Sequence, residues 1–511
     1  MENETKTIFF FDDWLLQYRC GTERKWFQAE ILPEYETLYS DDGLELSFNG
    51  PNVLRTNEGL WRMWATGYTD LSNGDEGGAS YLYCSENGVD WKPDKDIFGN
   101  YCVFKGEYAK GGHKGGDAIF RGKNERESAR QFTTAELPVT PSEQDELRAA
   151  FYDIREQDPM KRYKFVYVDL SSDAYELGAA RTAFSPDGRH WTIDKEAQWN
   201  KQHTDGYSAF VYNPYTGKYF FAGRPILGDR RVAIYQTEDF KHYEKPFVVL
   251  QPDCIDPPMT EFYGMPVMPY YNMFLGFLFK HCCDPLDNGV FFRGHGRIVP
   301  ELTYSINGMS FQRASRQPLI RYDSLRYGQM YPASAVLNGD RIFIYSFASI
   351  NTHGEEYSKS KTLKSGLSVS SIRKDGFCAL ENSSQRGEFC LRPMIYRGGD
   401  ITINASTSAY GRIRAELRNP QDHGDSTIIE GFTLEDSIPV AGDSCSHTLR
   451  WKNADLSALK NKPVMLRIEL TQARVYAVRM QGIYRYGFVP LLDLSGSFIP
   501  GHWWDTVDNF E

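Results

Sequence analysis

Three acidic residues stand at the heads of segments that resemble β-strands. They are Asp117 in the run GGDAIF, Asp205 in TDGYS and Glu261 in TEFYGM. Each lies beside small or apolar residues, where an unpaired charge is costly unless it faces a wet pocket. Three carboxylates in one pocket would suit cleavage of a glycosidic bond: one attacks or activates water, one protonates the leaving oxygen, and one stabilises the developing charge. Taken alone, each aspartate fits a turn cap at least as well.

Near these strand heads lie side chains that could bind a sugar. Aromatic faces stack on sugar C–H groups, and polar groups hydrogen-bond to hydroxyls. The candidates are Asn49, Trp64, His113, His203, Tyr207, Arg224, Tyr263, His281, Arg326, Gln329 and Tyr331. Core packing is the alternative for the aromatic residues, and for Trp64 it is favoured. Solvated surface is the alternative for the arginines. The histidines lack the spacing of a metal site, so we predict no metal and no cofactor.

A seven-residue turn motif recurs along the chain and predicts the elements that hold these residues. Its copies are SENGVDW at 85–91, SPDGRHW at 185–191, TEDFKHY at 237–243, SINGMSF at 305–311 and a looser SIRKDGF at 371–377. Asn-Gly and Asp-Gly favour the positive φ angles of tight hairpin turns. Each copy is therefore predicted to join two adjacent strands of a four-stranded meander.

Five such meanders predict an all-β fold, a five-bladed β-propeller over residues 1–385, with a polar insertion at about 121–160. Radial repetition leaves few exposed strand edges, and the first strand of each blade lines a shared channel. Asp117, Asp205 and Glu261 would meet in that channel. The alternative is a set of unrelated hairpins in a β-sandwich.

Residues 386–481 lose the turn motif and alternate polar with apolar residues, as in DITINA and RIRAEL. This pattern predicts a small β-sandwich domain, with a continuation of the propeller as the less favoured alternative. The tail, residues 482–511, is predicted to pack on the propeller or on a neighbouring subunit, which leaves a homo-oligomer open.

Composition narrows the partners and the compartment. The 511 residues include 57 Lys and Arg against 68 Asp and Glu, a net charge of −11, with no basic block. This balance argues against nucleic acid and anionic membranes as partners and leaves a small-molecule carbohydrate. The N-terminus lacks the basic start and long apolar core of a signal peptide, and no apolar run reaches about 20 residues. The nine cysteines form no CxxC pair. We therefore expect reduced thiols and a cytoplasmic protein.

Together these residues resemble the five-bladed β-propeller glycosidases, which include invertase- and levanase-like and arabinanase- and xylosidase-like enzymes. Those families carry Asp, Asp and Glu on successive blades, the order of Asp117, Asp205 and Glu261 here. The segments FFDDWL, EFYGMP and GFTLED look more closely like bacterial proteins similar to the invertase-type N-terminal propeller domain, which have a C-terminal β-sandwich. That match covers nearly the whole chain.

The resemblance implies a glycoside hydrolase with Asp117 as nucleophile or general base, Asp205 as stabiliser and Glu261 as general acid. The invertase-type motif Trp-x-Asn-Asp-Pro-Asn-Gly is absent, and Asp12-Asp13 stand near the N-terminus instead, which makes Asp13 a fourth catalytic candidate. The Arg-Asp-Pro and Glu-Cys motifs are also absent. A fructan substrate is therefore not carried over.

The leading hypothesis is an exo-acting glycosidase for a small oligosaccharide, on furanosides such as fructosides or arabinofuranosides. A phosphorolytic or transglycosylating enzyme is one alternative, with Arg224 among the groups that could bind phosphate. A propeller that binds carbohydrate without catalysis is another. Retention or inversion depends on the separation of two carboxyl groups, about 5 Å or about 6.5 to 9.5 Å respectively.

Overall fold

The computed structural model describes a chain that is almost entirely β. The described residues are 5–32, 45–46, 51–56, 59–68, 78–95, 97, 102–105, 127–128, 133–134, 152–153, 155–169, 179–193, 204–205, 210–225, 229–285, 291–321, 323–354, 365–384, 386–421 and 426–484. Within these ranges the helices are short 3₁₀ turns. None of the described helices is long and apolar enough to span a membrane.

The chain divides into two compact units. A terminal unit combines Met1–Phe27 with Lys374–Glu511, and a central unit holds Gln28–Arg373. The sequence analysis placed the boundary at residue 385 and assigned the N-terminus to the first domain. The compact units divide earlier, and the first 27 residues belong with the C-terminal part of the chain.

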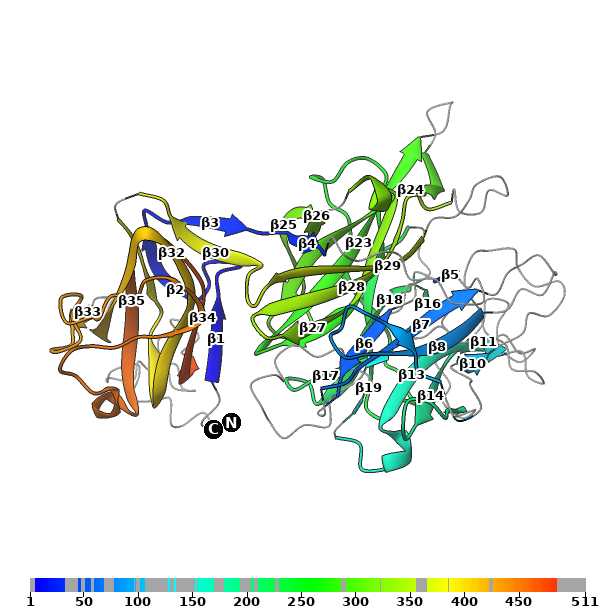
Figure 1. The fold of residues 1–511 in the computed structure, drawn as a ribbon, viewed down its shortest axis with the longest axis horizontal. Helices are drawn as coiled ribbons and strands as arrows, with labels where there is room; N and C mark the ends of the chain where they lie inside the picture. The colour runs from blue at the N-terminus through cyan, green and yellow to red at the C-terminus, as the bar shows by residue number, and fades with distance from the viewer. Residues whose placement is uncertain are drawn as a thin grey trace, which may run out of the picture. The chain divides into compact units, whose positions relative to one another are not determined.

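The central unit begins with three separate antiparallel sheets (Figure 1). The first contains β5 (Glu45–Leu46), β6 (Asn52–Arg55), β7 (Trp61–Tyr68), β8 (Gly78–Ser85), β9 (Lys92–Pro93) and β10 (Cys102–Lys105). The second contains β11 (Glu127–Ser128), β12 (Thr133–Thr134), β13 (Tyr163–Asp169), β14 (Ala179–Ser185) and β15 (Thr192–Ile193). The third contains β16 (Thr204–Asp205), β17 (Val211–Asn213), β18 (Lys218–Pro225), β19 (Val232–Thr237) and β20 (Phe247–Leu250).

The fourth sheet of the central unit has ten strands and joins two meanders. The first meander contains β21 (Thr260–Gly264), β22 (Val267–Tyr270), β23 (Met273–Pro285), β24 (Phe291–Ser305) and β25 (Gln312–Pro318). The second contains β27 (Gln329–Asn338), β28 (Arg341–Ser349) and β29 (Ser365–Arg373). A parallel contact between β24 and β27 joins the two.

The last meander is completed by a strand from the start of the central unit. Strand β4 (Ala29–Ile31) pairs antiparallel with β29, and β26 (Ile320–Arg321) pairs with its other edge. In Figure 1, β4 is blue although the strands around it are green to yellow, which marks its distance from them in the sequence. Residues more than 300 positions apart in the chain therefore share one sheet edge.

The turn motif forms hairpins as predicted in its first four copies. Ser85 Oγ accepts hydrogen bonds from the backbone N–H groups of Asn87 and Gly88, at 3.3 and 3.0 Å. Asn87 Oδ1 accepts from Val89 and Asp90, both at 2.9 Å. The copies at 185–191, 237–243 and 305–311 make the same kinds of bonds. The serine or threonine and the Asx residue thus satisfy the turn's own backbone donors.

The fifth copy, at 371–377, does not join adjacent strands of one sheet, so that prediction was wrong. Strand β29 before it pairs with β28 and β4, whereas β30 (Cys378–Asn382) after it pairs with β3 (Glu23–Trp26) and β35 (Lys462–Tyr484). The chain passes from the central to the terminal unit here. Asp375 of this copy is fully buried and bonds to Arg479 and Asn404 instead of serving only its own turn.

Side chains from one sheet reach the turn of another in a closed cycle around the central unit. Trp64 Nε1 donates to Gly188 O at 2.7 Å, linking the first sheet to the second. Thr182 Oγ1 donates to Phe240 O at 3.3 Å, linking the second to the third. The cycle continues with Asn213 Nδ2 to Asn307 O at 2.8 Å and ends with Tyr345 OH to Gly88 O at 2.8 Å, which returns to the first sheet.

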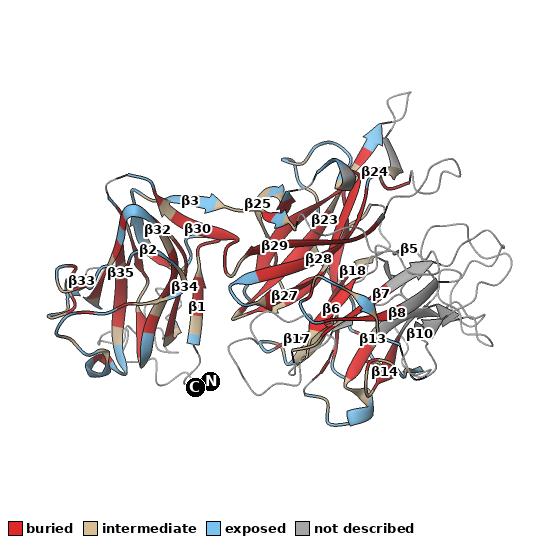
Figure 2. Cartoon of the chain, in the orientation of Figure 1, coloured by how far each residue is buried: buried red, intermediate tan, exposed pale blue. Residues whose placement is uncertain are grey.

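The core of the central unit draws on several of these sheets. One cluster of buried side chains contains Val53, Met63 and Tyr83 of the first sheet together with Phe279 and Tyr345 of the ten-stranded sheet. Figure 2 shows buried residues in red along much of β23, β27 and β28. A sheet with one face in solvent has strands whose buried and exposed residues alternate. In β19 all six residues are buried, and in β21 all five are buried, so both faces of these strands are covered.

The terminal unit has one nine-stranded sheet built from both ends of the chain. Its strands are β1 (Thr5–Phe9), β2 (Leu16–Cys20), β3, β30, β31 (Gly387–Leu391), β32 (Met394–Pro420), β33 (Ser426–Ile428), β34 (Asp443–Thr448) and β35. The long strand β35 pairs with β1, β30, β31 and β32. Because β1 and β2 lie in this sheet, the N-terminal residues are integral to the unit's core, where Phe10 packs on Phe389 at 5.0 Å between ring centroids.

Candidate active site

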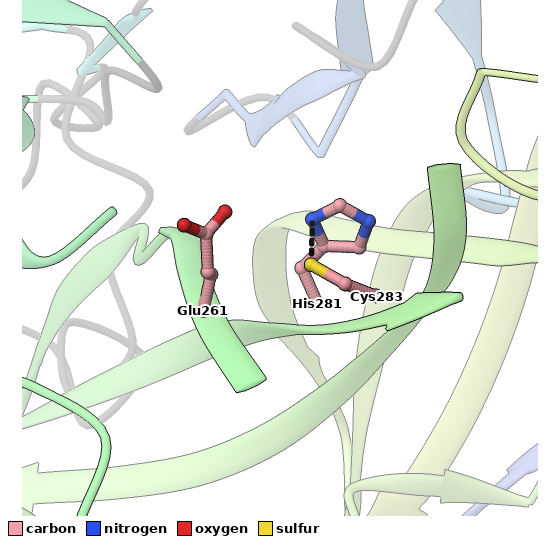
Figure 3. Close-up of side chains that lie close together, drawn as sticks. All are labelled: Glu261, His281 and Cys283. Atoms are coloured by element: carbon pink, nitrogen blue, oxygen red, sulfur yellow. Dashed lines mark hydrogen bonds between the residues drawn. The ribbon is translucent and has the colours of Figure 1, made fainter. Parts of the chain in front are cut away.

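Glu261 and His281 face each other across two strands of the central unit. They are direct antiparallel partners on β21 and β23. Cys283 follows His281 by two residues, and alternate residues of a strand share a face. All three are buried, and one ligand atom from each lies within 4.8 Å of the others. Figure 3 shows the three side chains on one side of the sheet, with His281 Nδ1 3.7 Å from Cys283 Sγ.

Glu261 is held by an arginine that precedes the neighbouring strand β19. Arg230 Nη1 lies 2.5 Å from Glu261 Oε2, and the Glu261 side chain is only 5% exposed. The backbone fixes the pair as well, because Phe262 N donates to Arg230 O at 3.0 Å. An ion pair with additional hydrogen bonds compensates the cost of burying a carboxylate.

Tyr263 lies next to this pair and contacts two guanidinium groups. The Arg224 and Arg230 guanidinium carbons lie 4.5 and 5.4 Å from the centre of its ring. Arginine over a tyrosine face is a favourable cation–π arrangement. Since Arg224 belongs to β18 and Tyr263 to β21, this contact joins the third sheet to the ten-stranded sheet at the site.

His353 orients the tyrosine hydroxyl. Its Nδ1 is 2.6 Å from Gly294 O and its Nε2 is 3.0 Å from Tyr263 OH. Burial lowers the pKa of His353 to about 4, so the imidazole is neutral at pH 7. A carbonyl oxygen only accepts, so Nδ1 carries the proton and Nε2 accepts from the Tyr263 hydroxyl. The Tyr263 hydroxyl therefore donates its proton to His353 Nε2, and any further hydrogen bond to the Tyr263 oxygen is one that this oxygen accepts.

Two buried polar atoms at the site have no hydrogen-bond partner among the described residues: His281 Nε2 and Asn351 Nδ2. His281 is 0% exposed and Asn351 is 8% exposed. Burial, and secondarily the nearby His353, lowers the pKa of His281 to about 2, so this ring is also neutral at pH 7. A buried polar atom without a partner costs about 1–3 kcal/mol, unless a water or a ligand meets it.

The first strand of the last meander supplies a rigid polar wall. Tyr331 OH donates to Gln329 Oε1 at 2.7 Å, and Gln329 Nε2 donates to Asn351 O at 3.0 Å. The Tyr331 ring lies 6.0 Å from that of Tyr263. The Asn351 carbonyl can only accept, so it fixes Nε2 of the Gln329 amide toward it and leaves Oε1 to accept from the Tyr331 hydroxyl.

The structure brings together six of the residues that the sequence analysis selected. They are Arg224, Glu261, Tyr263, His281, Gln329 and Tyr331. Asp205 is the last residue of β16, and its backbone pairs in register with that of Arg224. Five selected residues lie outside the described part of the chain: Asn49, His113, Asp117, His203 and Tyr207.

Three selected residues have other environments. Trp64 is 0% exposed and packs in a core cluster with Leu82 and Tyr163, so it is a packing residue that joins two sheets. Asp13 belongs to the terminal unit, where its half-exposed carboxylate pairs with Arg19 and Arg24. Arg326 is bound by Asp323 at 2.7 Å and by Ser368 Oγ at 2.8 Å.

Two residues of the site, Cys283 and Asn351, were not considered from the sequence. Arg230 and His353 were considered among the arginines and histidines of predicted loops, without a specific role. One signal for Cys283 was available, because the pattern His281-x-Cys283 places both side chains on one face of a strand. Asn351 follows β28 without a local pattern that separates it from other turn residues.

Comparison with known proteins leaves the chain unassigned. No family model matches it, and no curated protein matches it. Among solved structures, it is similar to a glycosyl hydrolase from Bacteroides ovatus, with TM-score 0.42 and 13% identity over 68% of this chain and 94% of that one. A GH130 glycoside hydrolase that targets β-1,2 mannosidic linkages in Candida mannan gives 0.40 and 12%, over 68% and 94%. A thermostable family-43 glycoside hydrolase gives 0.36 and 11%, over 67% and 96%. TM-scores this low support no assignment of fold or function.

Proposed function

We propose that the chain is a glycoside hydrolase and that its central unit is a five-bladed β-propeller. Five antiparallel meanders support the blade count, and the cycle of side-chain contacts to neighbouring turns supports a closed ring. The pairing of β4 with β29 is what ring closure requires, because a strand from the start of the unit completes its last meander. We further propose that the terminal unit is a β-sandwich.

The reaction would take place where the first strands of successive meanders meet. Strands β16, β21 and β27 carry Asp205, Glu261 and Gln329. The observation that carries the proposal is a pair of buried polar atoms that lack a hydrogen-bond partner among the described residues: Asn351 Nδ2 and Nε2 of His281, the residue that pairs with Glu261 in register. A sugar offers hydroxyl groups that both donate and accept, so a bound sugar would satisfy an imidazole nitrogen and an amide N–H together.

Glu261 would serve as general acid, with Asp117 as nucleophile or general base and Asp205 as stabiliser. A general acid must reach the leaving oxygen, whereas Arg230 occupies Oε2 of Glu261. Substrate binding would therefore have to draw Arg230 away from Glu261. The Tyr263 ring already contacts the guanidinium groups of Arg224 and Arg230, so it would continue to support Arg230 after this side chain moves away from Glu261.

The test is turnover of a panel of nitrophenyl furanosides and pyranosides, with and without phosphate. We expect Glu261→Gln and Asp117→Asn each to lower turnover at least ~100-fold, the scale of losing a general acid or a nucleophile. Glu388→Gln, a carboxylate of the terminal unit paired with Arg467, is the matched control and should retain activity. Equal activity in all variants would remove the assigned carboxylates from the mechanism.

Phosphorolysis is a second candidate because Arg224 and Arg230 lie together beside Glu261. Two guanidinium groups can bind a phosphate with paired hydrogen bonds. Turnover that requires phosphate and releases a sugar phosphate would favour this reaction over hydrolysis. Binding of sugars with no product from any glycoside would instead favour a non-catalytic carbohydrate-binding protein.

A further inference from the structure

The three residues Glu261, His281 and Cys283 offer a carboxylate, an imidazole and a thiol at one buried point. This donor set differs from that of an acid–base site alone. Imidazole and thiolate together favour borderline and soft cations such as Zn²⁺, and a carboxylate is a common third ligand. Oxygen-seeking cations such as Mg²⁺ and Ca²⁺ do not favour a thiolate.

The separations suit a single tetrahedral ion. With Zn–N of about 2.05 Å and Zn–S of about 2.3 Å, two ligands at the tetrahedral angle lie about 3.5 Å apart. His281 Nδ1 and Cys283 Sγ are 3.7 Å apart. The three ligand atoms lie within 4.8 Å of one another, so binding one ion would require the side chains to approach by up to about 1.3 Å. In Figure 3, Nδ1 is on the edge of the His281 ring that faces Glu261.

The backbone prepares these positions. Glu261 and His281 are fixed opposite each other by the register of β21 and β23, and Cys283 follows on the same face. Sites on strands are held more precisely than sites on loops. Arg230 bonds to Glu261 Oε2 and would act as a second-layer partner that orients the carboxylate if Glu261 bound an ion.

Charge is the main opposing factor. Arg224 and Arg230 lie nearby and would repel a cation. On binding, the Cys283 thiol would lose its proton to solvent and form an S–metal bond, so thiolate and carboxylate together would balance a divalent ion. The net charge of the site would still rise by one, because the Glu261 carboxylate, which offsets one of the two arginines before binding, would then offset the ion.

We propose that Glu261, His281 and Cys283 form a binding site for one Zn²⁺-type ion, with the fourth position open to water. The site is independent of the glycosidase assignment, but it shares Glu261 with it. An ion bound to Glu261 would occupy the carboxylate that the proposed reaction uses. Zinc is therefore expected to inhibit glycoside turnover while it occupies the site.

The experiment is titration of the chelator-treated full-length protein with Co²⁺, which absorbs visible light weakly as the octahedral aqua ion and strongly in a tetrahedral site. We expect one equivalent to produce tetrahedral bands and a thiolate charge-transfer band, both displaced by one equivalent of Zn²⁺. Cys283→Ser should abolish the charge-transfer band and weaken binding at least ~10-fold. Cys282→Ser is the matched control, because the adjacent cysteine faces the other side of β23, and it should bind as wild type does.

X-ray absorption at the zinc edge of the wild-type protein provides a readout that needs no variant. One sulfur at about 2.3 Å among nitrogen and oxygen neighbours is expected. A first shell without sulfur, a spectrum unchanged in Cys283→Ser, or no binding at stoichiometric cobalt would each overturn the proposal. Because these readouts measure the ion and not turnover, a protein that cleaves no glycoside could still bind the ion, and the two proposals fail separately.

Discussion

Ser334 provides a sharp test of the contacts between the first sheet and the last meander of the central unit. It lies on β27 of the last meander and is 1% exposed. Its hydroxyl accepts from Val53 N at 3.1 Å and donates to Pro51 O at 2.9 Å, so one oxygen joins the first sheet to the last meander. Ser334→Ala removes both bonds and leaves two buried backbone groups unmet.

Each orphaned backbone group costs about 1–3 kcal/mol, so Ser334→Ala is expected to lower the free energy of unfolding by about 2–6 kcal/mol. The matched control is Ser346 on β28, which is also 1% exposed. Its Oγ has no hydrogen-bond partner among the described residues. Ser346→Ala therefore removes a buried hydroxyl that satisfies nothing there, and stability should be unchanged or rise by up to about 1 kcal/mol.

Urea unfolding measures the difference, with tryptophan fluorescence and far-UV circular dichroism recorded together because the chain has two units. The transition midpoint should fall in Ser334→Ala and hold in Ser346→Ala, with equal slopes, since the same surface is exposed on unfolding. Equal midpoints in the two variants would refute the argument that this hydroxyl bridges the two ends of the central unit.

Three further predictions follow from buried or paired charges. Folding lowers the pKa of His353 from 6.5 to about 4, so the unfolded state binds more protons than the folded state between these pH values. The free energy of unfolding should therefore fall by about 3 kcal/mol from this group as the pH drops from 6.5 to 4. His353→Gln should flatten that part of a curve of stability against pH. Glu301 is fully buried and forms ion pairs with Lys280 and Arg313. Glu301→Gln should therefore lower the free energy of unfolding by about 3–5 kcal/mol in thermal or urea unfolding. A change below about 1 kcal/mol would show that these ion pairs are not needed for stability. Asp13→Asn should leave glycoside turnover within about twofold of the wild-type value and the free energy of unfolding within about 1 kcal/mol of it. The reason is that this half-exposed carboxylate pairs with two arginines of the terminal unit. A large loss of turnover would return Asp13 to the catalytic candidates.

Local patterns predicted the hairpins well. Strand β8 ends at Ser85 and β9 begins at Lys92, directly around the first copy of the turn motif. The same agreement holds around Ser305, where β24 ends and β25 begins at Gln312. These turns were predictable because a few adjacent side chains satisfy the turn's own backbone, so the signal is contained in seven residues.

Long-range pairing was not predictable in the same way. The fifth motif copy looks like the others, but its Asp375 bonds to Arg479, more than 100 residues away. Strand β4 has only three residues, and nothing within it indicates β29 as its partner. The N-terminal strands β1 and β2 join the terminal unit through pairings with β35 and β31, which a local alternation pattern does not specify.

In the candidate site, too, the residue types could be predicted from the sequence but their grouping in space could not. Glu261, Tyr263 and His281 could be selected because polar and aromatic residues at strand heads are informative by type. Their grouping depends on the register between β21 and β23, which includes an irregularity between Phe262 and Gly264. A one-residue slip would place the partners on opposite faces, so the meeting of Glu261 with His281 and Cys283 is a property of the fold.

The pairing of β4 with β29 also sets a schedule for synthesis. Residues 29–31 leave the ribosome long before their pairing partners, Ser370 and Ser371, are synthesised. At about 5–20 residues per second, that edge waits roughly 15–70 s for its partner. Strand β1 waits longer still, for β35. The nascent chain thus carries unpaired strands that can pair with wrong partners. Translation speed, or a chaperone that covers the first 31 residues, should therefore affect how much protein forms these two pairings.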